Sequence, residues 1–155
     1  MIKTAALAHI PALVALEEAC FTTDRLRPRH FKHLIQSESA QVYVYFKHGN
    51  ITASAVILFR KNSKAARLYS IAVDPMHRGE GIAKKLYLKL ESYLLKHGFK
   101  EFRLEVRIDN HPAISFYQKS GFEIIERLPD YYEDGTEALR MRKHLNSKLT
   151  GGKYA

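Results

Sequence analysis

The stretch between residues 73 and 83 decides the fold: Val73-Asp74-Pro75-Met76-His77-Arg78-Gly79-Glu80-Gly81-Ile82-Ala83. β-Branched and apolar residues lead into it and predict a strand that ends at Asp74-Pro75. Apolar residues at helical spacing follow it and predict a long helix that begins near Ile82 and stops at Gly98. The stretch is therefore a glycine-containing loop between a strand and the N-terminus of a helix.

The small residues of this loop favour anion binding. Gly79, Gly81 and Ala83 let backbone N–H groups converge at the helix N-terminus, where unpaired donors and the positive end of the helix dipole suit a pyrophosphate. The loop fits neither the dinucleotide pattern G-x-G-x-x-G nor the Walker Gly-Lys-Ser/Thr pattern. On the glycines alone, a tight turn that binds nothing is the alternative.

Hydrophobic patterning predicts two helices and several strands before the loop. We expect a short strand at residues 2–5, a helix that ends at Cys20 and a second short helix around Phe31. β-Branched and aromatic runs predict strands at residues 42–47, 51–60 and 66–73, with a hairpin turn at His48-Gly49-Asn50. These strands form an antiparallel meander.

The pattern after the long helix predicts three more strands and one helix. Residues 101–108 alternate between apolar and charged side chains, so Glu105 points away from the side of Phe102 and Leu104. Asn110 caps a helix that ends at Gly121. Strands at residues 122–128 and 137–143 follow, joined by the loop 129–136.

The composition is typical of one globular domain. Of 155 residues, 46% are hydrophobic and 26% are charged, values that argue against disorder and low complexity. We find no repeat and no linker, so we expect a single domain over residues 1–145 and a polar, flexible tail over residues 146–155.

Cysteine and charge content restrict the compartment and the partners. The single cysteine, Cys20, excludes an intramolecular disulfide framework, and the histidines lack metal-ligand spacing, so we expect no metal. No apolar run approaches a membrane span and no secretory signal follows Met1, which predicts a cytoplasmic protein without a membrane partner. The formal charge of +9 suits a phosphorylated cofactor, RNA or the ribosome. We expect no specific DNA binding.

Several motifs together resemble one family. Residues 78–83 resemble the Q/R-x-x-G-x-G/A acetyl-coenzyme A motif of the GNAT N-acetyltransferase superfamily, and residues 110–122 are similar to its N-x-x-A-x-x-x-Y-x-x-x-G-F signature. The likeness covers residues 66–143 well and earlier residues weakly. It is greatest to the bacterial ribosomal-protein alanine N-acetyltransferases and related protein N-terminal acetyltransferases. It implies an α/β (α+β) fold, with a mixed, mostly antiparallel sheet of about seven strands, splayed in the middle, and about four helices.

The resemblance implies a site for acetyl-coenzyme A. Backbone groups of Ile71, Ala72 and Val73 would pair with the pantetheine arm where two strands separate. The loop would hold the pyrophosphate, and Asn110 would either contact the cofactor or only cap its helix. The loop residues implied are Arg78, Gly79, Glu80, Gly81, Ile82, Ala83 and Lys84. Glu80 is an awkward charge beside phosphates, so we expect it to point outward to solvent.

The resemblance also implies the catalytic pair. Glu105 would act as base through water, and Tyr117 as the acid that reprotonates the thiolate. The alternatives are a surface ion pair between Glu105 and Arg103 or Arg107, and a packing role for Tyr117. Phe21, Arg25, Tyr131 and Tyr132 are the expected acceptor-binding residues.

The expected activity is direct acetyl transfer from acetyl-coenzyme A to a primary amine, most consistent with a protein or peptide N-terminus. A small amine such as a polyamine, amino acid or aminoglycoside is the alternative acceptor. A non-enzymatic basic module that binds RNA or the ribosome is a further alternative, which no RNA-binding motif supports.

Overall fold

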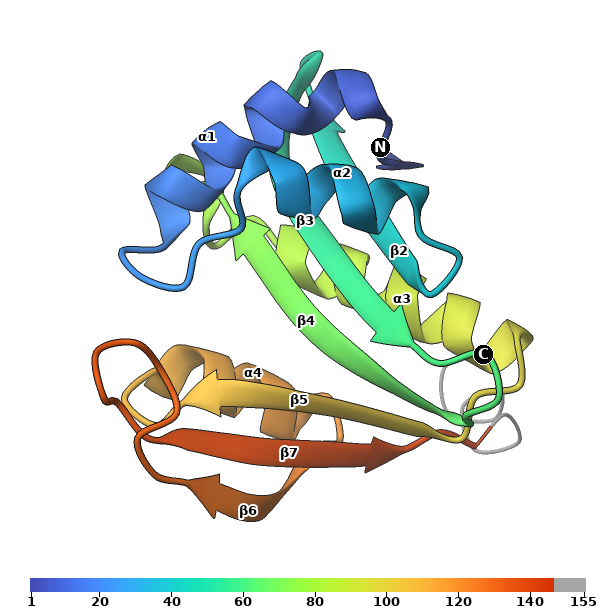
Figure 1. Cartoon of the computed structure of the whole chain (residues 1–155), viewed down its shortest axis with the longest axis vertical. Coiled ribbons are helices and arrows are strands. Elements are labelled where there is room, and N and C mark those ends of the chain that lie inside the picture. Colours follow the sequence, from blue (N-terminus) through green and yellow to red (C-terminus); the bar gives the residue numbers. More distant parts are fainter. Residues whose placement is uncertain (147–155) are drawn as a thin grey trace.

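The computed structural model describes residues 1–146 and shows one mixed sheet with helices on both faces (Figure 1). The strands run in the order β1-β2-β3-β4-β5-β7-β6. Their bounds are β1 (Ile2–Thr4), β2 (Ala40–Lys47), β3 (Asn50–Phe59), β4 (Ala65–Val73), β5 (Glu101–Arg107), β6 (Glu123–Leu128) and β7 (Ala138–His144). The helices are α1 (Ile10–Cys20), α2 (Pro28–Gln36), α3 (Ile82–Lys96) and α4 (His111–Lys119), with 3-10 turns η1 (Leu7–His9) and η2 (Pro75–His77).

The sheet opens in its middle. Strands β4 and β5 are parallel, and their pairing ends at Leu68 with Leu104, although both strands continue. All other neighbouring strands are antiparallel. Figure 1 shows the two halves diverging beyond this point, with α1 and α2 in front of one half and α3 behind it. The fold confirms the mixed, splayed sheet and the four helices expected from the sequence.

Two apolar clusters hold the helices on the sheet. In the first cluster, fully buried Leu86, Leu90 and Leu94 of α3 pack with Phe102 of β5. In the second cluster, Leu13 of α1 and Phe31 of α2 are fully buried. The alternation along β5 buries its apolar side chains on the α3 side and leaves its charged side chains on the opposite face, as predicted. That charged face has no helix over it in Figure 1.

Local signals set the helix ends. The Asn110 side chain accepts a hydrogen bond from Ala113 N–H at 3.2 Å and caps α4. Two histidines act as capping-box partners at the third position of η1 and α2: His9 Nδ1 accepts from Ala6 N–H, and His30 Nδ1 from Arg27 N–H.

One expectation from the sequence, the polar tail, lies mostly outside the described residues. Residues 147–155 of the expected tail are beyond the described residues. Within residues 1–146 no helix is both long and apolar enough to cross a bilayer.

Candidate active site

The loop before α3 contains two glycines in a left-handed conformation and leaves the helix N-terminus without a side-chain cap. Gly79 and Gly81 have φ of +83° and +79°, a left-handed conformation that favours glycine. Gly81 is the N-cap of α3 and supplies no side chain to cap it, so the first N–H groups of the helix stay available to a ligand. Lys84 follows in the first turn and is exposed, whereas Ile82 is buried beneath the loop.

Arg78 and Glu80 behave differently from what the motif alone suggests. The Arg78 guanidinium donates to the Val73 carbonyl at 3.2 Å and ties the loop to the end of β4. Glu80 was expected to point outward, and its side chain is 36% exposed, but it is ion-paired with Lys47 at 2.5 Å. The hydrogen bond from Lys47 lowers the pKa of Glu80. Lys47 therefore neutralises the acidic charge between Gly79 and Gly81.

The opening between β4 and β5 lies next to this loop. Ile71, Ala72 and Val73 pair with β3 on one side, while β5 has already separated from β4. The Val73 carbonyl accepts a hydrogen bond from Cys20 Sγ at 3.3 Å. The half-buried Cys20 thus helps to fix the end of β4.

Glu105 occupies the charged face of β5 between two arginines. Its side chain is only 6% exposed, with Oε1 2.7 Å from Arg67 Nε and Oε2 2.9 Å from Arg140 Nε. The alternative of a solvated pair with Arg103 or Arg107 is wrong, because the partners come from β4 and β7, which flank β5. Glu105 is therefore a nearly buried carboxylate with two cations beside it.

Tyr132 lies within electrostatic reach of both Tyr117 and Glu105. Burial, with a smaller contribution from Tyr132, raises the pKa of Tyr117 above its ordinary value. Burial raises the pKa of Tyr132 to about 12. The neighbouring Tyr131 and, to a smaller extent, Glu105 add to this rise. Both phenols therefore keep their protons at neutral pH and can serve as hydrogen-bond or proton donors.

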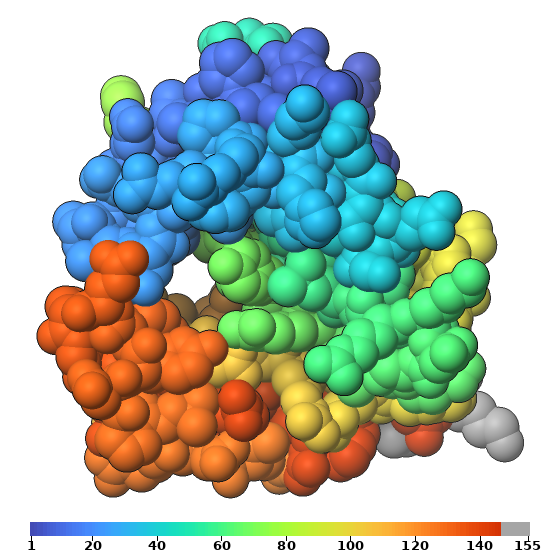
Figure 2. Space-filling view, in the orientation of Figure 1, coloured from blue at the N-terminus to red at the C-terminus, as the bar shows by residue number. Residues whose placement is uncertain are grey.

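Arg107 connects the two loops that border the opening. It donates to Thr23 in the α1–α2 loop at 3.4 Å and to Thr136 in the β6–β7 loop at 2.9 Å, and it is ion-paired with Asp134. Its guanidinium also lies 4.7 Å from the centre of the Tyr132 ring. Figure 2 shows the blue α1–α2 loop and the orange β6–β7 loop meeting beside an opening next to the green strand β4.

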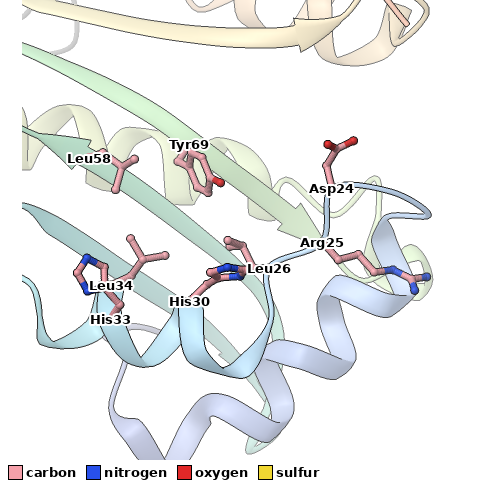
Figure 3. Close-up of a pocket in the computed structure, with 8 residues that line it drawn as sticks. All are labelled: Asp24, Arg25, Leu26, His30, His33, Leu34, Leu58 and Tyr69. Carbon is pink, nitrogen blue, oxygen red and sulfur yellow. The ribbon is translucent and has the colours of Figure 1, made fainter. Parts of the chain in front are cut away.

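The remaining expected acceptor residues lie in the α1–α2 and β6–β7 loops. The Tyr131 hydroxyl accepts a hydrogen bond from Arg67 at 3.0 Å. Phe21 ends α1 and is half-buried, and Arg25 Nε donates to its carbonyl at 2.5 Å. Arg25 is therefore held against the end of α1 (Figure 3).

Asn110 is exposed and makes the capping bond, which supports its structural role.

No group of three or more histidine, cysteine, aspartate or glutamate side chains within the described part of the chain is arranged to hold a metal.

Comparison with known proteins supplies the family. The family model described as acetyltransferase (GNAT) family matches residues 10–122, which is most of the chain. The chain belongs to the GNAT acetyltransferase family. Like its relatives, this GNAT protein is an N-acetyltransferase.

Three similar proteins match over most of both chains. This GNAT chain is 32% identical over 124 residues to N-alpha-acetyltransferase 30 of Schizosaccharomyces pombe, covering 70% of the chain and 83% of the relative. The Escherichia coli ribosomal-protein-S18-alanine N-acetyltransferase has a TM-score of 0.85 and 26% identity, over 94% of both chains. Ard1 of Thermoplasma volcanium has a TM-score of 0.82 and 29% identity, over 94% of this chain and 97% of that one.

Sequence reasoning missed Arg67 and Arg140 at this GNAT site, and it considered Arg107 only as a partner of Glu105. Arg67, Arg107 and Arg140 come from three strands and meet Glu105 or the two bordering loops. In the sequence Arg67 and Arg140 are members of general basic clusters. Only the charged face of β5 signalled that Arg107 shares a side with Glu105, and nothing in the sequence gave the pairing of β5 with β7.

Proposed function

We propose that this GNAT enzyme acetylates the N-terminal α-amine of a protein or peptide with acetyl-coenzyme A. The observation that carries the proposal is that Arg107 joins the α1–α2 and β6–β7 loops beside the β4–β5 opening. In the β6–β7 loop, Tyr131 is hydrogen-bonded to Arg67, the partner of Glu105, and Tyr132 lies within electrostatic reach of Glu105. Hydroxyl groups and aromatic faces at that position suit an extended peptide backbone. The names of the similar N-alpha-acetyltransferases support this assignment.

The chain can bind the cosubstrate through backbone rather than side-chain chemistry. The uncapped N-terminus of α3 and the two left-handed glycines fit a pyrophosphate, and exposed Lys84 adds positive charge. The backbone of Ile71, Ala72 and Val73 borders the opening on the β4 side. Acetyl-coenzyme A would supply the activated acetyl group as a thioester.

Two protein side chains carry the proton transfers in this proposal. Glu105 removes a proton from the incoming ammonium, directly or through water, and Arg67 and Arg140 fix its carboxylate. Tyr117 donates its proton to the leaving thiolate, and burial keeps that proton on the phenol until it is needed. Each positioned acid or base typically contributes about 10²- to 10⁴-fold in rate.

A competition experiment tests the acceptor. The enzyme is incubated with acetyl-coenzyme A, peptides with free N-termini and small biological amines, and the products are identified by mass spectrometry. Acetylated peptide α-amines are the expected result. Acetylation of a polyamine, amino acid or aminoglycoside alone would contradict the peptide proposal and favour a small-amine enzyme.

The exposed face of α3 favours a second, compatible property: docking on an RNA-containing assembly such as the ribosome in the cytoplasm. The one acid of α3, Glu91, is buried and paired with Lys143, so its exposed charges are lysines 84, 85, 89 and 96. Among the described residues none of these four lysines is ion-paired. Co-sedimentation with ribosomes should fall steeply with salt and with the double change Lys89→Glu and Lys96→Glu.

A further inference from the structure

The loop before α3 is not held in place by packing. Gly79, Glu80 and Gly81 are exposed. Apart from chain neighbours, a Cβ atom placed on either glycine would meet no heavy atom of the described chain within 4 Å. Within residues 1–146, the backbone groups of Gly79 and Glu80 make no hydrogen bond to other backbone groups. These groups are available to an anion, but the conformation of the loop then depends on side-chain contacts.

The two glycines make this conformation costly to hold. Gly79 and Gly81 have φ of +83° and +79°, and glycine adopts negative φ just as readily. Without further contacts the loop would exchange among many conformations, and few of these direct its N–H groups to one point. The apparent affinity for a ligand falls in proportion to the fraction of the protein that is in the binding conformation.

Glu80 supplies a side-chain contact between the two glycines. Its carboxylate is ion-paired with Lys47 at 2.5 Å, and His77 Nδ1 lies 3.4 Å from it. Lys47 is the last residue of β2. His77 belongs to η2, and the Asp74 side chain caps this turn by accepting from Met76 N–H at 2.9 Å. Both partners of Glu80 therefore belong to regular elements of the fold.

The direction of the Glu80 side chain is compatible with a phosphate beside the loop. Lys47 ends β2, and in the sheet β3 and β4 separate β2 from β5 and from the opening. The ion pair therefore holds the carboxylate toward the half of the sheet that lies away from the opening. An acid in this loop can thus anchor the backbone without facing the phosphate groups.

We propose that Glu80 and Lys47 form a brace that holds the loop before α3 in its binding conformation before coenzyme A arrives. Both are positioning residues, because they act through the glycine backbone and not through contact with the ligand. The brace rests on the proposed acetyl-coenzyme A site and is independent of which amine is acetylated. It gives the acidic charge of Glu80 a favourable effect on the binding of an anion.

Glu80→Gln separates the brace from simple charge repulsion. Repulsion alone predicts that coenzyme A binds the variant more tightly, whereas the brace predicts a Kd about two- to fivefold higher, the effect of one exposed ion pair. Lys47→Met should raise the Kd by a similar factor. The double variant should bind no more weakly than either single variant, because each change alone breaks the same contact. Isothermal titration calorimetry with coenzyme A measures these Kd values.

Glu123→Gln and Lys61→Met are the matched controls for net charge. Each makes the same change of charge at an exposed residue on another element: Glu123 begins the edge strand β6, and Lys61 lies in the turn between β3 and β4. Each control should change the Kd by less than the corresponding variant of the brace.

NMR relaxation of the protein without coenzyme A gives a second readout. The order parameters of the Gly79 and Gly81 amides should fall in Glu80→Gln and in Lys47→Met and keep wild-type values in the two controls. A Kd for Glu80→Gln at or below the wild-type value, or unchanged order parameters, overturns the brace and leaves the proposed function intact. A wild-type protein that binds no coenzyme A overturns the proposed cosubstrate site and the brace with it.

Discussion

Replacing Glu105 with glutamine separates a catalytic role from a structural one. The carboxylate contacts two guanidinium groups at 2.7 and 2.9 Å and is 6% exposed. Glutamine keeps the shape but removes the charge and turns an N–H₂ group toward one arginine. The change therefore weakens both ion pairs and also removes the proposed base.

The expected loss of stability follows from these contacts. A hydrogen bond to a charged group contributes about 1.5–3 kcal/mol when buried, and an exposed pair contributes about 0.2–1 kcal/mol. Arg67 and Arg140 are 42% and 32% exposed, so solvent screening brings the two pairs together to about 1–3 kcal/mol. For a chain of this length that loss lowers Tm by roughly 2–12 °C.

The expected loss of activity is much larger than the loss of stability explains. At a temperature where the variant is folded, kcat should fall by about 10²- to 10⁴-fold. The deficit should be greatest below about pH 7.7, the lower end of the α-amine pKa range, where most of the acceptor is protonated. Above that pH the amine is already neutral and the deficit should narrow.

Arg140→Met is the matched variant, since it removes one ion pair of Glu105, together with the exposed pair of Arg140 with Glu126, and leaves the Glu105 carboxylate in place. Thermal denaturation should show a similar decrease in Tm, while initial-rate assays should show a much smaller decrease in kcat. A kcat for Glu105→Gln within threefold of wild type would refute the base assignment. Glu105 would then be an ion-pair residue of the sheet.

Further predictions test the acid, the loop before α3 and a buried charge. Tyr117→Phe should lower kcat by about 10²- to 10⁴-fold and leave the acetyl-coenzyme A Kd unchanged in calorimetry; a weakened Kd would make Tyr117 a binding residue instead. Gly81→Val imposes a β-branched side chain on φ +79° and should weaken cosubstrate binding, whereas Gly49→Val, with the same φ in a hairpin turn, carries similar strain of about 1–3 kcal/mol and should bind normally. Burial raises the pKa of Glu17, so its ionisation destabilises the folded state increasingly as pH rises above about 4.5. Glu17→Gln keeps an acceptor for Leu26 N–H and should gain stability relative to wild type between pH 4.5 and 7 in denaturant unfolding; an unchanged difference across that range would contradict the buried charge.

The sequence by itself determined the elements, because local chemistry sets them. Glycines that tolerate positive φ, prolines at strand and helix ends and the Asn110 cap act on a few neighbouring residues. Alternation along residues 101–108 fixed the two faces of β5, since side-chain direction in a strand has a period of two. These signals placed the loop before α3 and the side of β5 that carries Glu105.

Only the tertiary structure decided the surroundings of Glu105 and the acceptor site. Arg67 and Arg140 lie 38 residues before and 35 residues after Glu105 in sequence, and they reach it because β4 and β7 flank β5. Strand order and register depend on how the whole sheet packs on α3, which no local pattern encodes. The same holds for Arg107, which joins two loops that are more than 100 residues apart in the chain.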